Sequence, residues 1–273
     1  MALHGLMAAI FAPAEWGMAL GVLGAFLYLG FIWFFGGVFL SDVMHMGIAH
    51  KALNFRPGFL GFIVLFWNTA GIYTNPTTWV NRHRHHHAFS DYPGDPNKLA
   101  HDGFWKTLYL CLFPYECRKN LATERIFQTR TFRLVSSPYF AVFSQFSSFG
   151  IVWLAVRDWG FTLVLWCSVR LLALWANMIQ NYWTHERHFG TRRYDDDDNA
   201  MNLGDWLPVT VSFGASLQNN HHHFPHFVRA SHDDQEYDFG FLTVRAMKKL
   251  GLVTASASGA QKPEGIPLRE VGV

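Results

Sequence analysis

Cysteine is scarce in this chain, and its charges nearly balance. The three cysteines, Cys111, Cys117 and Cys167, form no C-x-x-C pair, so neither a disulfide framework nor a thiolate zinc site is indicated. The formal net charge of +2 is too small to suggest binding to nucleic acid. The 273 residues suffice for one large domain or two small ones, and half of them are hydrophobic. The class of the protein is therefore indicated by where the apolar residues lie along the chain.

Charge is missing altogether from two long stretches, and a third is broken by a single arginine. Gly17–Leu40 and Pro138–Val156 carry no charge, and Gly160–Gln180 carries only Arg170. A helix needs about 20 apolar residues to cross a bilayer, so the sequence predicts an integral membrane protein. The N-terminus lacks the basic segment and the small-residue cleavage site of a secretory signal, so we expect the first span to be retained.

Basic residues predict the orientation of these spans. They lie mainly between residues 51 and 133 and again at 187–193, whereas the turn Arg157–Trp159 carries one arginine and one aspartate. The positive-inside rule therefore places the histidine-bearing regions in the cytoplasm. Because an even number of crossings must then separate them, we expect the shorter apolar stretch Gly58–Thr74 to dip into the membrane or lie along its surface.

Histidine is abundant, and a dense cluster lies within Asn81–Asn97. On a helix, His83, His86 and His87 share one face, which is how a helix presents ligands to a metal. His85 falls on the opposite side. The alternative is a protonatable surface cluster, which would repel itself when charged.

Two further clusters follow apolar segments. His45 and His50 are about 140° apart on a straight helix, so they can serve two metals or straddle a helix end but cannot easily chelate one metal. Near the C-terminus, Gln218, His221 and His222 repeat the spacing of the central cluster.

The third apolar stretch carries a polar stripe that ends in histidines. Arg170, Asn177 and Asn181 fall near one face of the helix and lead to His185 and His188. A polar stripe on a membrane helix faces the protein interior or a cavity. A structural hydrogen-bonding stripe is the alternative, but the terminal histidines favour a site.

The histidines that share these patterns are too many for one tetrahedral zinc and suit two metals with open positions. The eight candidate ligands are His45, His50, His83, His86, His87, His185, His221 and His222. An open, nitrogen-rich pair of redox metals beside a bilayer suggests O2 chemistry on a lipid-soluble substrate.

The order of these motifs resembles the membrane fatty acid desaturase and hydroxylase superfamily. The motifs are H-x4-H, H-x2-H-H, N-x3-H and Q-x2-H-H, from about Ser41 to Gly240. The segment WVNRHRHHHAFSD (Trp79–Asp91), followed by Asp95-Pro96-Asn97, is similar to the central box of acyl-CoA desaturases, and NNHHHFP (Asn219–Pro225) and EYDFG (Glu236–Gly240) extend the likeness.

The resemblance implies a di-iron centre bound by the eight histidines, with Asn181 contacting one iron through a water. It implies that O2 and two supplied electrons remove two hydrogens from a saturated acyl chain, leaving a cis double bond. The protein must hold that chain kinked and dry. Trp67, Trp153 and Trp175 are candidates for the substrate tunnel, although ordinary packing is the alternative for each.

Three features depart from the family pattern. Gln218 stands where many relatives have a histidine, and it can coordinate only weakly or hold a water. The chain after His185 is longer than usual, so His188 is an alternative ligand, and Asn181-Tyr182-x-x-His185 also resembles an element of alkane hydroxylases. Only one clear span precedes the first histidine pair, unless residues 1–16 help to form another.

The expected fold is therefore all-α: transmembrane hairpins with a cytoplasmic helical cap that holds a histidine-rich dimetal site. We expect the desaturase domain to cover residues 1–250 and residues 251–273 to form a disordered tail. Trp206–Leu217 is a candidate interfacial segment. The acidic run Asp195–Asp198 is expected to be a solvated loop.

Two other functions stay open. A di-iron hydroxylase acting on an acyl or alkyl chain would keep the same site, and a membrane metal transporter would need ligands within the spans. As partners we expect the lipid membrane, an acyl substrate on coenzyme A, a carrier protein or a phospholipid, and a separate electron donor resembling ferredoxin or cytochrome b5. The basic loop Lys98–Arg133 is a candidate docking surface, with ordinary positive-inside charge as the alternative.

Overall fold

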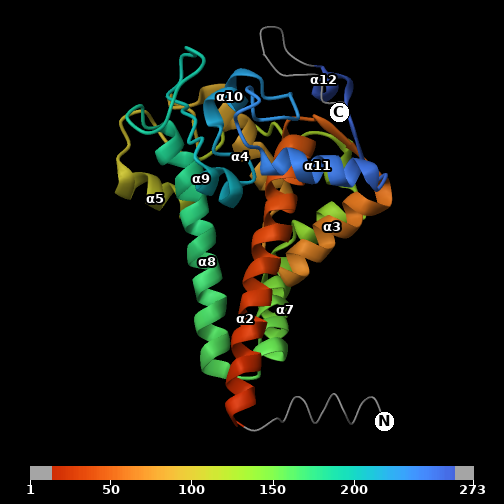
Figure 1. Cartoon of the computed structure of the whole chain (residues 1–273). Helices are drawn as coiled ribbons and strands as arrows, with labels where there is room; N and C mark the ends of the chain where they lie inside the picture. The colour runs from red at the N-terminus through yellow and green to blue at the C-terminus, as the bar shows by residue number, and fades with distance from the viewer. Residues whose placement is uncertain (1–13, 262–273) are drawn as a thin grey trace.

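The computed structural model describes residues 14–261 and consists of a helical stem and a broader head (Figure 1). The stem contains α2 (Ala14–Gly37), α7 (Pro138–Val156) and α8 (Trp159–Asn181), and α2 continues into the head as the π-helix η1 (Val38–Ala49). Mutual contacts among α2, α7 and α8 hold the stem together. The chain thus enters the head first through η1 and returns to it through α8.

The three stem helices have the length and apolar composition of membrane spans. Apolar helical segments long enough to cross a bilayer cover Ala19–Ala49, Pro138–Val156 and Trp159–His185. The predicted apolar stretches are thus confirmed as long helices. Between α7 and α8 the chain reverses at Arg157, whose φ of 60° is left-handed, and the Asp158 side chain caps α8 by accepting from the Phe161 amide.

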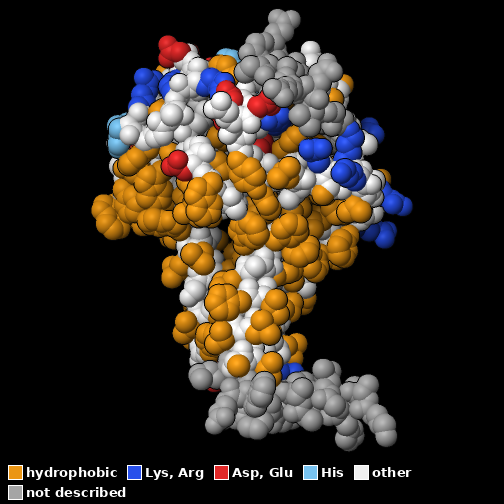
Figure 2. Space-filling view, in the orientation of Figure 1, with side chains coloured by type: hydrophobic (Ala, Val, Ile, Leu, Met, Phe, Trp, Pro, Cys, Tyr) orange, Lys and Arg blue, Asp and Glu red, His pale blue; other side chains and the backbone are white. Residues whose placement is uncertain are grey.

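The surface of the stem is apolar. Side chains such as Phe26, Phe146 and Leu171 are each more than 60% exposed. In Figure 2 hydrophobic side chains cover the stem and the lower part of the head, whereas charged side chains gather on the upper part. An apolar surface of this extent is typical of contact with lipid.

The head is built from short elements. Its helices are α3 (Pro57–Ala70), α4 (Pro76–Phe89), α5 (Phe104–Leu112), α6 (Arg130–Val135), α9 (Trp206–Ser212), α10 (Gln218–His223), α11 (Phe239–Lys249) and α12 (Ala257–Ala260), with 3-10 turns η2 (Arg125–Gln128) and η3 (Trp183–His185). The apolar helix α3 has 14 residues, fewer than a span requires. It slants away from the stem below α11 in the view of Figure 1.

The all-α expectation is confirmed, and a small two-stranded antiparallel sheet is added to the helical head. Strands β1 (Leu53–Phe55) and β2 (Val253–Ala255) pair, with Leu53 opposite Ala255. The disordered tail was expected to begin at residue 251, but β2 and α12 belong to the folded head. Residues 262–273 lie outside the described residues. Val253 is 2% exposed and packs in an apolar cluster with Phe241 and Met247. The sequence near residue 253 does not indicate this pairing, because the partner strand lies about 200 residues earlier in the chain.

Candidate metal centre

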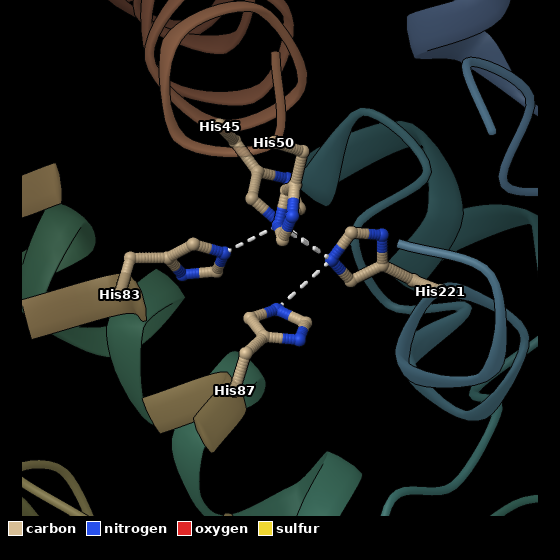
Figure 3. Close-up of side chains that lie close together, drawn as sticks. All are labelled: His45, His50, His83, His87 and His221. Atoms are coloured by element: carbon tan, nitrogen blue, oxygen red, sulfur yellow. Dashed lines mark hydrogen bonds between the residues drawn. The ribbon is translucent and has the colours of Figure 1, made fainter. Parts of the chain in front are cut away.

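The eight candidate histidines converge in the head in two adjoining groups. The five-histidine group contains His45, His50, His83, His87 and His221, and the three-histidine group contains His86, His185 and His222. Within each group, one possible ligand atom per residue lies within 4.8 Å of all the others. Figure 3 shows the five rings turned toward a common centre. Either group can hold a metal ion.

The π-helical geometry of η1 brings the first pair together. His45 and His50 were expected to point apart, yet their ring centroids are 4.9 Å apart and both belong to the five-histidine group. The His50 amide donates to the His45 carbonyl at 3.0 Å, an i to i−5 bond. This bonding turns the chain less per residue than an α-helix does, so residues five apart fall on one face. The expectation that they could not easily chelate one metal rested on a straight α-helix, and the structure places both in one group of possible ligands instead.

Helix α4 presents three histidines from one face, as its spacing predicts. Pro76 and the Asn75 side chain, which accepts from the Thr78 amide, start the helix. His83 and His87 join the five-histidine group, and His86 joins the three-histidine group. His85 belongs to neither group, and its Nε2 lies 2.6 Å from the Lys119 carbonyl oxygen. One short helix therefore contributes to both groups.

Helix α10 also contributes to both groups, and η3 contributes the last histidine. His221 joins the five-histidine group, and its neighbour His222 joins the group of three. His185 in η3 is 1% exposed. The alternative His188 has a side chain that is 67% exposed and lies outside both groups. The extra chain length after His185 thus forms surface and leaves His185 in the interior.

A carboxylate holds each ring of the three-histidine group. The Nδ1 atoms of His86 and His185 lie 2.9 Å from Asp95 Oδ2 and Asp91 Oδ2, respectively. The Nδ1 atom of His222 lies 2.5 Å from an oxygen of Asp198. A hydrogen bond at Nδ1 fixes the tautomer and leaves Nε2 free to bind a metal.

The sequence motifs did not identify these three aspartates as partners of the histidines. Asp198 belongs to the acidic run that was expected to be a solvated loop, and its neighbour Asp196 bonds His223 at 2.7 Å. That expectation was wrong for these two residues, because the run folds back against α10. The need of a metal-binding histidine for a partner at its second nitrogen was the available signal, but it did not identify which carboxylate would serve.

Buried nitrogen atoms without partners face the centre of the three-histidine group. The Nε2 atoms of His86 and His185 are buried and make no hydrogen bond. Burial acts to lower the pKa of His86, but the charge and hydrogen bond of Asp95 outweigh it and raise that pKa. Buried ring nitrogens that lack a hydrogen-bond partner, on rings already held in place, fit the requirements of a metal site.

The five-histidine group packs its rings directly against one another. His221 Nε2 lies 2.9 Å from His45 Nε2 and 3.1 Å from both His50 Nε2 and His87 Nε2. The Nε2 atoms of His50 and His83 are 2.7 Å apart. Burial, followed by the charges of neighbouring histidines, lowers the pKa values of His50, His83, His87 and His221 well below the usual range. Neutral rings with nitrogens turned inward are the form that binds metal.

An arginine clamp joins the chain segments that carry the five-histidine group. Arg84 on α4 donates to the carbonyl oxygens of Ile48 and Ala49, at the end of η1. It also bonds Glu124, which pairs with Lys51 at 2.7 Å. Partial burial acts to raise the pKa of Glu124, but the bonds from Arg84 and Lys51 lower it to about 2. The clamp therefore fixes the end of η1, beside His45 and His50, against α4, which carries His83 and His87.

Two amides were predicted to contact metal or water, and one of them, Gln218, lies against a candidate ligand. Gln218 is 4% exposed, its Nε2 lies 2.9 Å from His222 Nε2, and its Oε1 is buried without a hydrogen bond. Asn181 is 8% exposed and donates to the Asn177 carbonyl. Their contact with a metal stays a prediction. Gln218 is the better placed of the two, because it touches a candidate ligand atom.

The three tryptophans proposed for a tunnel are not brought together. Trp67 is 1% exposed and packs beside Phe39 in the head core. Trp153 stacks on Trp159 at the turn between α7 and α8. Trp175 is 50% exposed on α8. Each has the surroundings of a packing or surface residue, so a shared tunnel lining stays a prediction without a structural counterpart.

Comparisons with known proteins point to one family. The family model described as "Fatty acid desaturase" matches residues 6–232. The sn-1 stearoyl-lipid 9-desaturase of Anabaena variabilis is 28% identical, over 89% of this chain and 86% of that protein. The sn-2 palmitoyl-lipid 9-desaturase of Nostoc sp. (strain 36) is 26% identical, over 96% and 90%. A hex-5-enoyl-[acyl-carrier protein] acetylenase of Moorena producens is 25% identical, over 81% and 73%.

Proposed function

Because this chain belongs to the fatty acid desaturase family, we propose that it introduces a cis double bond into a saturated acyl chain carried by a membrane lipid. The single observation that carries this proposal is the convergence of eight histidines, from four distant segments, into two adjoining groups. Relatives named as acyl-lipid 9-desaturases support a lipid-linked substrate and position 9 of its chain.

The two histidine groups are the proposed sites for two iron ions. The five-histidine group would hold one ion and the three-histidine group the other, with Gln218 beside the second. When bound, such an iron pair supplies the oxidising power, drawn from O2 and two electrons, that unactivated C–H bonds require. The electrons would come from a separate donor protein resembling ferredoxin or cytochrome b5.

The protein's own contribution is to orient the ligands and exclude water. Asp91, Asp95 and Asp198 fix the tautomers of the three rings they touch. Five of the eight candidate ligands are buried and the other three are partly buried, so few water molecules can reach a bound ion. A dry, fixed site suits a reaction in which the reactive species must meet the acyl chain before it meets solvent.

Expression in a host that lacks such an activity, followed by fatty acid profiling, tests this function. We expect a new acyl product lighter than its parent by two hydrogen atoms, whereas a product heavier by one oxygen atom would indicate the hydroxylase alternative. His185→Ala should abolish the product, and the matched control His188→Ala should keep it, because His188 is exposed. An unchanged lipid profile with well-expressed protein would contradict the proposal.

We also propose that the stem crosses the membrane and that the head lies on the cytoplasmic side. The apolar segments of α2, α7 and α8 support the crossing. Helix α5, which packs against α8, exposes Trp105 by 78%, Tyr109 by 54% and Leu112 by 58%, at i, i+4 and i+7 on one face. Aromatic side chains on an exposed apolar face are typical of the membrane–water interface.

Cysteine labelling in intact cells tests this placement. In a background with the three natural cysteines changed to serine, Arg157→Cys should react with a membrane-impermeant thiol reagent from outside. Asp195→Cys, at a fully exposed position of the head, should react only after the membrane is permeabilised. Labelling of both positions from the same side would rule out the proposed topology.

A further inference from the structure

Lys98 is buried beside the three-histidine group. Its side chain is 1% exposed, and it is the only lysine or arginine among the buried side chains of residues 14–261. Taking an ammonium group out of water is strongly unfavourable unless opposite charges compensate it. The position of this charge therefore needs an explanation that ordinary packing does not provide.

Lys98 pairs with two carboxylates that adjoin His185: one is its neighbour in sequence and the other is its hydrogen-bond partner. Lys98 Nζ is 3.2 Å from Glu186 Oε1, on the residue that follows His185, and 3.9 Å from Asp91 Oδ1. Asp91 accepts from His185 Nδ1 through its other oxygen, Oδ2, which also accepts from the Asn199 amide. Asp91 Oδ1 is buried and makes no hydrogen bond. Lys98 is thus the cation that faces the open oxygen of the carboxylate behind His185.

The other two carboxylates of the group are compensated differently. Asp198 has Arg192, a partly exposed side chain, at 3.8 Å. Asp95 accepts hydrogen bonds from the His86 ring and from the amides of Asp91 and Asn97. Of the three carboxylates, only Asp91 has a buried lysine or arginine within ion-pair distance.

We propose that Lys98 is a positioning residue that controls how strongly His185 donates to a bound metal, an inference that rests on the proposed function. A carboxylate that accepts the Nδ1–H hydrogen bond makes the ring more basic, so that Nε2 donates electron density more strongly to a metal. The ammonium offsets the charge of Asp91 and limits this effect. Without Lys98, His185 would stabilise the oxidised metal more, and the reduction potential of the pair would fall.

A redox titration of the iron-loaded protein in lipid nanodiscs tests this role, with bound iron counted separately. Lys98→Met should lower the midpoint potential, and Lys98→Arg, which keeps the charge, should restore much of it. Glu186→Gln removes the competing partner of Lys98 and should shift the potential upward. Lys248→Met makes the same change at an exposed site on α11 and should leave the potential unchanged.

The outcomes separate this proposal from the proposed function. Wild-type protein that binds no iron would contradict the function itself. Iron-loaded Lys98→Met with an unchanged potential would overturn only the role of Lys98, since a purely structural lysine would not move it. If Lys98→Met fails to fold, Lys98→Gln decides, because it removes the charge but keeps a polar side chain: a lowered potential supports the proposal and an unchanged one rejects it.

Discussion

The two histidine groups adjoin, yet they are held in place by different means. In the three-histidine group each ring is bonded to an aspartate at Nδ1, so its direction is set before any metal arrives. In the five-histidine group the structure records Nε2 contacts between rings, and the support comes from the backbone clamp of Arg84. The three-histidine group is thus oriented ring by ring, whereas the five-histidine group is assembled by packing whole segments together.

The largest expected effect comes from removing the ring at the centre of the five-histidine group. His221 Nε2 contacts the rings of His45, His50 and His87, so His221→Ala should cost that group its metal and reduce product below detection. Metal analysis and fatty acid profiling measure the two effects. His223→Ala is the matched control, since His223 bonds Asp196 outside both groups. Retained metal and turnover in His221→Ala would show that the five-histidine group is not a metal site required for the reaction.

A smaller and more selective effect is expected from the carboxylates. Asp95→Asn should weaken metal binding by the three-histidine group about 10–100-fold, because Asp95 is fully buried and holds the His86 ring. The bound metal should fall from two ions per chain toward one, as measured by elemental analysis. Asp196→Asn, in the same acidic run as Asp198, should leave two. Equal loss from both groups would show that they are a single unit.

The smallest effect concerns the clamp and depends on pH. The folded pKa of Glu124, about 2, lies below its ordinary value of 4.5. The clamp's contribution is therefore present above pH 4.5 and is lost as the pH falls toward 2. Glu124→Gln should lower the stability of the metal-free protein by about 1 kcal/mol at neutral pH and remove that acid-dependent part.

Denaturant unfolding in detergent, repeated from pH 7 to pH 2, measures the effect of Glu124→Gln. Glu116→Gln is the control, because Glu116 is exposed. A Glu124→Gln variant with the wild-type pH profile would show that the ion pairs of Glu124 do not contribute to the free energy of unfolding.

Much of the site was predictable because its signals are local. The spacing of His83, His86 and His87 requires only an α-helix, and α4 forms one. The length of the apolar stretches likewise predicted the three long helices. The relation of His45 to His50 was mispredicted because it depends on a π-helix, whose bonding pattern cannot be read from residue spacing.

The amino-acid sequence by itself determined which residues were candidate ligands, which segments were apolar enough to span a membrane, and which family the motif order resembles. These properties follow from residue type and short-range periodicity. Only the tertiary structure decided how the eight histidines divide into five and three, that His185 lies inside and His188 outside, and which aspartates stand behind the rings. It also placed Lys98 beside Asp91 and paired β1 with β2. Contacts between segments far apart in the chain depend on packing, and packing leaves no periodic trace in either segment.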